Sequence, residues 1–238
     1  MKQTNTNVTQ TVSSCSERRT LARITGAAGL LTVLAVLGTS LANDYPSSPS
    51  GADPGEVVTF FRTLDDTFGA FSSWATSVGL IAMLWFSIGL ALLLRRYEGD
   101  LPWRSAFLAS AGVVSVVTGQ IGAWDAAVLR SDDIDPQVAR YAFDLGDVSF
   151  VNGWVATGAV AICAGLLMLR TGSIPNWLGW WALAAGIGQV LARAVWTEGF
   201  ALLPGAAYWI WVAVLCVLLL RGRLVVTDQP QVSDRRMP

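Results

Sequence analysis

Two ionisable side chains, Asp125 and Arg193, lie at the ends of long apolar runs of the sequence. A charge within a membrane span is costly, so it indicates either a function or a fixed partner. If the runs are helices, both residues fall near the same membrane surface. The chemistry open to them is a mutual salt bridge, or an outward-facing polar site that binds a small solute or ion.

Three uncharged polar side chains fall at a similar depth. Gln189 precedes Arg193 by one helical turn and shares its face, while Gln120 and Asn152 lie near the ends of two other apolar runs. In the structural interpretation, these amides complete the hydrogen bonds of an Asp125–Arg193 pair. In the binding interpretation, the same five residues line the site, so the candidate binding residues are Asp125, Arg193, Gln189, Gln120 and Asn152.

The sequence offers little for catalysis, because it contains no histidine. This excludes Ser-His-Asp and Cys-His nucleophile systems, His-ligated haem and most catalytic zinc sites. Cys15, Cys163 and Cys216 form no C-x-x-C pair and no disulfide framework. Asp144-Leu145-Gly146-Asp147 lacks the first glycine of the intramembrane aspartyl protease motif, and no phosphate-binding loop or G-x-S-x-G turn is present. We therefore expect no catalytic residue, no cofactor, no metal site and no enzyme activity.

Composition places the chain in a membrane. Of 238 residues, 53% are hydrophobic and 14% are charged, whereas a soluble domain has about 25% charged residues. The net charge of −1 gives no reason to expect nucleic acid as a partner. The expected partner is the lipid bilayer.

Six long runs are almost free of charge: 24–42, 74–94, 105–125, 148–169, 175–195 and 204–220. Each approaches the roughly 20 residues that a helix needs to cross a bilayer, and each is apolar on nearly every face. The predicted fold is all-α, an integral membrane bundle of six transmembrane helices over 22–222. We expect 1–21 to be a disordered cytoplasmic N-terminus and 223–238 a cytoplasmic tail.

The arginines and lysines give the orientation. With both termini in the cytoplasm, twelve of the 16 basic residues fall inside, and Arg62, Arg130, Arg140 and Arg193 fall outside. This distribution follows the positive-inside rule for a multi-pass plasma membrane protein. Ser40-Leu41-Ala42 could instead be a signal cleavage site, which would leave five spans, but the preceding apolar run is longer than a usual signal core. We expect the first span to be retained.

The first outer loop contains an amphipathic helix pattern. Val57, Phe61, Leu64, Phe68 and Phe71 recur at steps of three and four residues. This helix would lie on the outer membrane surface or cap the bundle, with a lid over a substrate as the alternative.

The second outer loop carries Asp132, Asp133 and Asp135, a fragment of a calcium loop. It lacks the glycine and the distal glutamate of an EF-hand, so we expect a solvated acidic loop.

Small residues form stripes on two spans, which let helices approach closely. One stripe is Gly153, Thr157, Ala161 and Gly165; the other is Thr25, Gly29 and Thr32. We expect packing within the bundle, with a homo-oligomer as the alternative use.

Two segments carry a resemblance to a known group. They are Arg18-Arg19 before Ala22-Arg23-Ile24-Thr25-Gly26-Ala27-Ala28-Gly29, and Ile174-Pro175-Asn176-Trp177-Leu178-Gly179-Trp180 at the start of the fifth span. With the long outer loop, they resemble uncharacterised six-span membrane proteins of bacteria, the domain-of-unknown-function type found in actinobacteria. The resemblance implies no activity and no catalytic residues. The sequence thus favours a non-enzymatic structural or accessory membrane protein, with a small-solute or ion transporter or channel as the alternative.

Overall fold

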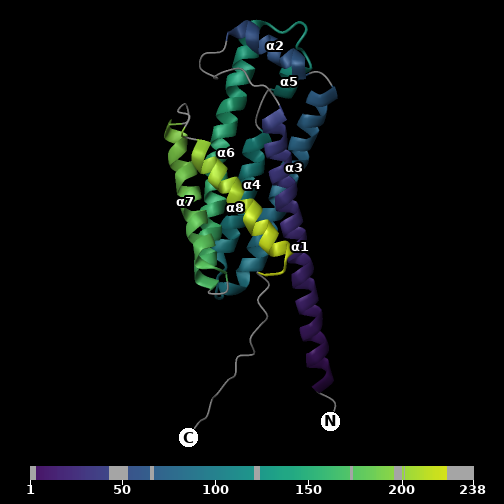
Figure 1. The fold of residues 1–238 in the computed structure, drawn as a ribbon, viewed down its shortest axis with the longest axis vertical. Helices are drawn as coiled ribbons and strands as arrows, with labels where there is room; N and C mark the ends of the chain where they lie inside the picture. Colours follow the sequence, from purple (N-terminus) through teal and green to yellow (C-terminus); the bar gives the residue numbers. More distant parts are fainter. Residues whose placement is uncertain are drawn as a thin grey trace.

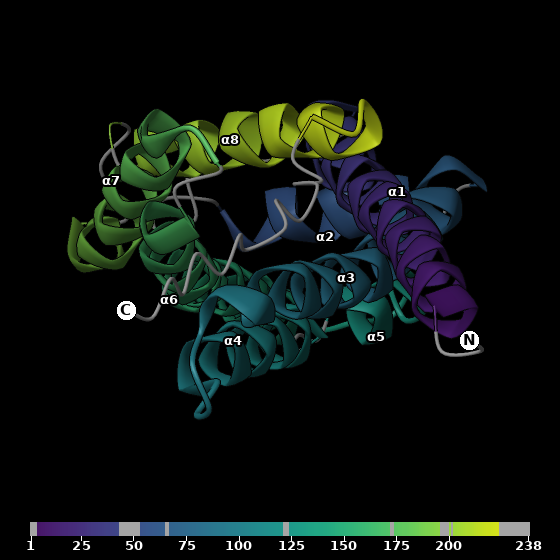
Figure 2. The ribbon, with the colours of Figure 1, turned by 90° about the horizontal axis from the view of Figure 1, so that it is seen from below.

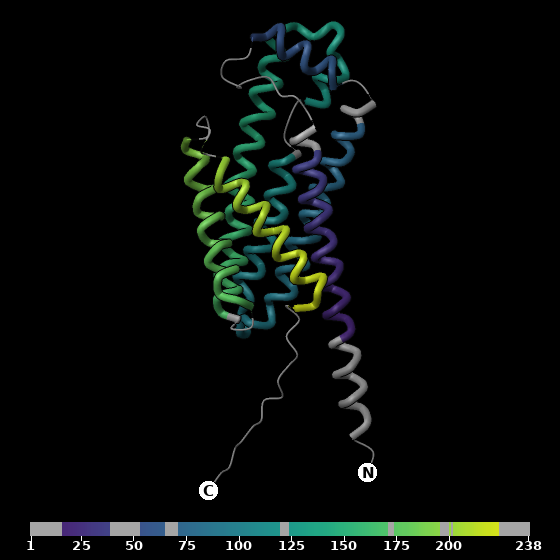
Figure 3. Tube along the Cα trace, in the orientation of Figure 1, coloured from purple at the N-terminus to yellow at the C-terminus, as the bar shows by residue number. Residues whose placement is uncertain are grey.

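The computed structural model describes residues 4–42, 53–64, 67–120, 124–171, 174–195, 200 and 202–223. Within these ranges the chain is helical and contains no strand. The helices are α1 (Thr4–Ala42), α2 (Pro54–Leu64), α3 (Thr67–Leu94), η1 (Arg95–Tyr97), α4 (Trp103–Gln120), α5 (Trp124–Val128), α6 (Pro136–Thr171), α7 (Asn176–Ala192), η2 (Arg193–Val195) and α8 (Leu202–Leu220). Figure 3 traces the path of the chain through them.

In the described part of the chain, six segments are long and apolar enough to cross a membrane, and they follow the six predicted spans in order. They are Ser16–Gly38, Phe71–Tyr97, Trp103–Val128, Pro136–Arg170, Asn176–Val195 and Leu202–Leu220. Many of their large apolar side chains face outwards, among them Leu34 and Trp85, which are 70% and 61% exposed. Such a surface is stable against lipid and not against water. The chain is therefore an all-α, multi-pass membrane protein, as predicted.

The six spans form a closed ring in sequence order. Each of α1, α3, α4, α6, α7 and α8 packs against the next, and α8 returns to α1. Figure 2 shows this arrangement along the bundle, and Figure 1 shows α8 crossing obliquely from α7 to α1. Short connections favour antiparallel packing of consecutive helices, which accounts for the neighbours α3 and α4 and the neighbours α6 and α7.

Large side chains from opposite sides fill the ring. Phe86 of α3 and Tyr208 and Trp211 of α8 are completely buried. The Trp211 indole N–H donates to the Leu178 carbonyl at 3.1 Å, and the Tyr208 hydroxyl donates to the Met83 sulfur at 3.8 Å. The two polar atoms that these aromatic residues carry into the core therefore have partners.

The first helix extends well before the predicted first span: α1 begins at Thr4 and runs without a break into it. The expectation that 1–21 is a disordered cytoplasmic segment stays a prediction. Helix formation is cooperative, so the span is a nucleus from which helical hydrogen bonds extend towards the N-terminus. Residues 1–3 and 224–238, which include most of the predicted tail, lie outside the described residues.

A separate apolar cluster lies at the end of the bundle where α2 is drawn in Figure 1. We call it the cap: α2, α5 and the first turns of α6, joined by buried side chains of Val57, Val58, Phe60, Phe61, Ala127, Ala139, Ala142 and Phe143. The predicted amphipathic helix is thus present and packs on the protein.

The predicted apolar face of that helix is only partly right. Val57 and Phe61 are buried, but Phe60 is buried as well, and Phe71 is 58% exposed. The helix ends at Leu64 and α3 begins at Thr67, so Phe71 belongs to a different helix. The side chain of Phe68 lies outside the described residues.

Candidate functional site

Three of the five polar residues singled out in the sequence lie near a close contact between α6 and α7. A Cβ atom added to Gly186 would lie 2.6 Å from the Gly158 carbonyl oxygen, and one added to Gly165 would lie 2.7 Å from that of Gly179. Both distances are too short for a side chain, so the two backbones touch directly. Small residues permit such an approach between membrane helices.

Two hydrogen bonds cross between the helices beyond these glycines. The Thr157 hydroxyl donates to Gln189 Oε1 at 3.2 Å, and Gln189 is only 2% exposed. One turn further on, at the start of η2 directly after α7, Arg193 Nε donates to Asn152 Oδ1 at 2.9 Å. We call these four residues, together with the glycine contacts, the α6–α7 seam. The structure thus brings three predicted site residues, Asn152, Gln189 and Arg193, to one seam.

Asp125 lies elsewhere. It is an exposed residue in the first turn of α5, and its Oδ1 accepts a hydrogen bond from the Ser73 hydroxyl of α3 at 3.0 Å. Asp125 and Arg193 therefore have separate partners, and the predicted direct pair is not formed. The reason is the ring order, in which α6 lies between α4 and α7. Gln120 is the last residue of α4, and its side chain lies outside the described residues.

The small-residue stripes are used within the chain. On α6, Ala161 and Gly165 face α7, but a Cβ added to Gly153 would meet no atom within 4 Å, and the close contact falls on Gly158 instead. The long side chains of Asn152 and Arg193 bridge the helices at the level of Gly153. On α1, Thr32 donates to the Gly79 carbonyl of α3 at 3.1 Å, and Gly29 faces Phe86 and Cys216.

The acidic loop stabilises a helix. Asp135 Oδ1 accepts the backbone N–H of Gln137 at 2.8 Å and that of Val138 at 3.4 Å, just before α6 begins at Pro136. This is an N-cap followed by a proline in the first helical position. Across the described part of the chain, no three acidic or cysteine side chains are grouped to hold a metal ion.

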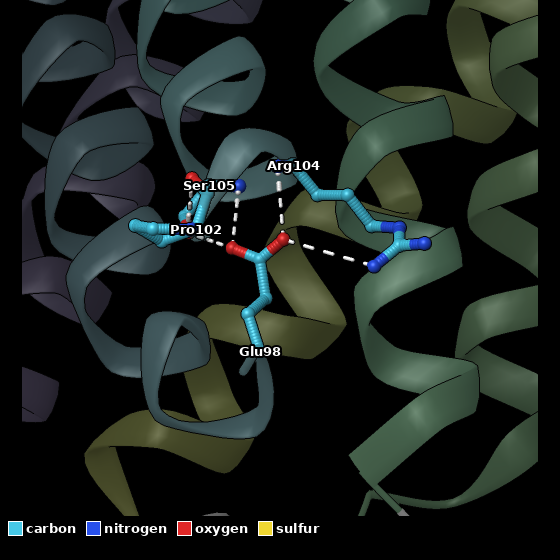
Figure 4. A network of polar contacts seen from close by, with 4 residues as sticks. All are labelled: Glu98, Pro102, Arg104 and Ser105. Carbon is cyan, nitrogen blue, oxygen red and sulfur yellow. Dashed lines mark hydrogen bonds and ion pairs between the residues drawn. The ribbon is translucent and has the colours of Figure 1, made fainter. Parts of the chain in front are cut away.

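Sequence reasoning missed a second capping interaction, at the start of α4. The Glu98 carboxylate accepts the backbone N–H groups of Arg104 and Ser105, both at 2.9 Å, and the Ser105 hydroxyl (Figure 4). The Arg104 guanidinium lies 3.9 Å away, and the Glu98 side chain is 1% exposed. The available signal was Pro102 at a helix start, which needs an acceptor for its free N–H groups.

The Glu98 carboxylate is held in its charged form. Burial alone would raise the pKa of Glu98, but the hydrogen bonds from Ser105 and Arg104 and the charge of Arg104 outweigh it. The pKa therefore lies below its ordinary value of 4.5. A negative charge at this helix N-terminus also interacts favourably with the positive end of the helix dipole.

The cap is held by aromatic packing and by Arg62. Trp124 and Phe143 stack with ring centres 5.5 Å apart, and Trp124 packs over Gly146, where a side chain would collide with it. Arg62 of α2 donates to the carbonyls of Ser131 at 3.0 Å and Asp132 at 3.2 Å. These contacts join α2 to the loop between α5 and α6.

Comparisons with protein families, curated proteins and solved structures find no match for this chain.

Proposed function

We propose that this protein is a non-enzymatic structural or accessory membrane protein, with a bundle that acts as a static scaffold. The observation that carries the proposal is the α6–α7 seam. Its polar groups bond to each other across the helices, Thr157 with Gln189 and Asn152 with Arg193. The adjoining glycine backbones are in contact. Polar side chains on a transport path would instead face a water-filled space or a substrate.

The alternative function, a transporter or channel, would use Asp125 and Arg193 together as an outward-facing site. Asp125 bonds to Ser73 on α3, whereas Arg193 bonds to Asn152 on α6, so the two residues have partners on different helices. The large side chains that fill the ring further favour a scaffold. The separation of Asp125 from Arg193 therefore supports the structural role over the transport role.

Vesicle flux tests the proposal. The purified protein would be reconstituted into liposomes loaded with dyes that respond to protons, sodium or chloride. Ion movements would be recorded from the dye signals, and osmotic swelling from light scattering. We expect the same permeability as in protein-free vesicles. A flux that the wild-type protein produces and that Arg193→Gln or Asp125→Asn abolishes would contradict the scaffold proposal and establish the transporter.

We also propose that the N- and C-termini are cytoplasmic and that the protein resides in the plasma membrane. The support is the uneven distribution of basic residues, twelve on one side and four on the other. Epitope tags at either terminus should then bind antibody only after cells are permeabilised. Antibody binding in intact cells would show that the tagged terminus is outside and would contradict the proposed orientation.

A further inference from the structure

A cavity of about 340 Å³ lies where α1, α3 and α8 meet, at the end of the bundle opposite the cap. Arginines Arg18, Arg95 and Arg96 line it, and its apolar wall includes Leu90, Leu215 and Leu219. Among the residues that the structure describes, no acidic one contributes to its lining. The volume falls in the range of small-molecule sites, about 300 to 1,000 Å³.

The electrostatic balance of the cavity favours an anion. The carboxyl ends of α3 and α8 lie nearby, and each contributes about half a negative charge. At α8 this partial negative charge is reduced, because backbone N–H groups cap the last carbonyls. Arg223 N–H donates to the Leu218 carbonyl and Gly222 N–H to the Leu219 carbonyl, in a turn where Gly222 has φ +67°. Three guanidinium groups therefore outweigh the helix ends.

Tyr97 holds one of the arginines in place. The Arg96 guanidinium lies over the Tyr97 ring, 4.6 Å from its centre, and donates to the Tyr97 hydroxyl. Tyr97 itself lines the cavity. An arginine fixed in this way loses less side-chain entropy when it binds a ligand.

The depth of the cavity identifies the ligand. The α3 span ends at Tyr97 and the α8 span at Leu220, so the arginines stand where a membrane span meets the lipid headgroups. The leucine wall extends from there into the span. A ligand that fits has a negative head at the membrane surface and an apolar chain below it.

We propose that this cavity binds one anionic phospholipid. Its phosphate is held by Arg18, Arg95 and Arg96, and part of one acyl chain lies against Leu90, Leu215 and Leu219. Guanidinium groups bind phosphate oxygens through paired, charge-assisted hydrogen bonds. A zwitterionic lipid brings no net charge to the arginines, and a free phosphate ion leaves the apolar wall unused, so both bind more weakly.

Retention of lipid by the purified full-length protein tests the proposal. The protein would be equilibrated in nanodiscs of phosphatidylcholine with a minor fraction of phosphatidylglycerol, and bound lipid would be counted by native mass spectrometry. We expect one retained phosphatidylglycerol. Arg95→Gln with Arg96→Gln should weaken its binding by about tenfold or more. Both arginines are exposed, so these substitutions leave the core unchanged.

The matched control is Arg221→Gln with Arg223→Gln, which removes the same charge at the same end of the bundle. Both residues are exposed and neither lines the cavity. We expect wild-type retention in this control. An equal loss of bound phosphatidylglycerol in both double variants would indicate general attraction of anionic lipid to the basic surface and would overturn the site. Unchanged retention in both would also overturn it.

Two further measurements test the apolar half of the site. Ala22 is 1% exposed and lines the cavity, so Ala22→Leu fills it without changing charge and should also lower retention by several fold. Unchanged retention would overturn binding of the acyl chain. Millimolar inorganic phosphate should leave the lipid bound; full displacement would show a simple anion site and overturn the lipid proposal.

Discussion

Arg193 bonds to Asn152 and not to Asp125: its Nε lies 2.9 Å from Asn152 Oδ1, while Asp125 accepts from Ser73. Both arrangements satisfy a costly polar group near the end of a span. They differ in which helices are joined, since the first joins η2, at the end of α7, to α6, and the second joins α5 to α3. Double-mutant cycles can distinguish them.

Arg193 should be energetically coupled to Asn152. We expect Arg193→Gln and Asn152→Ala each to lower the free energy of unfolding, with a coupling energy of about 1 kcal/mol between them. The measurement is SDS-induced unfolding of the single variants and the double variant in the same micelles. The control cycle pairs Arg193→Gln with Asp125→Asn, which should be additive within about 0.5 kcal/mol. A larger coupling energy in the control cycle than in the first cycle would contradict the Arg193–Asn152 bond and support a direct Asp125–Arg193 ion pair.

The α6–α7 contact should not tolerate a side chain at Gly186. Because a Cβ there would lie 2.6 Å from the Gly158 carbonyl, Gly186→Val should force the helices apart and cost about 1–3 kcal/mol. The midpoint of thermal unfolding in detergent reports the loss. Gly153→Ala is the matched control on α6, since its Cβ meets nothing within 4 Å and its stability should stay near wild type. Equal stability of the two variants would contradict the close packing.

The cap should loosen when Trp124 is displaced. Gly146→Ala places a methyl group where the Trp124 indole packs, so the indole must leave its stack on Phe143. Hydrogen–deuterium exchange over 54–64 should then become faster, because α2 packs on the same aromatic cluster. Exchange in α8 should stay unchanged. Gly99→Ala, where a Cβ meets open space, should leave the cap as it is.

Glu98 should stabilise the protein only where it is ionised. Its folded pKa lies below 4.5, so its contribution is fully present above the unfolded pKa and is lost as the pH falls through the folded pKa. Glu98→Gln should cost about 1 kcal/mol at neutral pH, as the loss of a helix cap does. The difference from wild type should shrink below about pH 4.5. If the stability difference between wild type and Glu98→Gln grew on acidification, the lowered pKa of Glu98 would be contradicted.

Much of the fold follows from the sequence because it depends on local composition. Each of the six apolar runs must satisfy its own backbone hydrogen bonds in lipid, which requires a helix wherever the run occurs. The four-residue spacing of Val57 and Phe61 likewise indicates a helix with one apolar face. The stripe of Thr157, Ala161 and Gly165 could also be predicted, since helical spacing alone places these residues on one face.

The partners of these residues were decided by the tertiary structure. Helical spacing gives the depth and the face of Asp125 and Arg193, but not which helices stand next to each other. The ring places α6 between α4 and α7, so Arg193 reaches Asn152 and Asp125 reaches Ser73. The same holds for Gly158, which becomes a contact only because α7 approaches at that level, and for the arginine cavity, which needs α1, α3 and α8 to meet. Local sequence fixes what each helix exposes, whereas the packing of the whole chain determines what each exposed group meets.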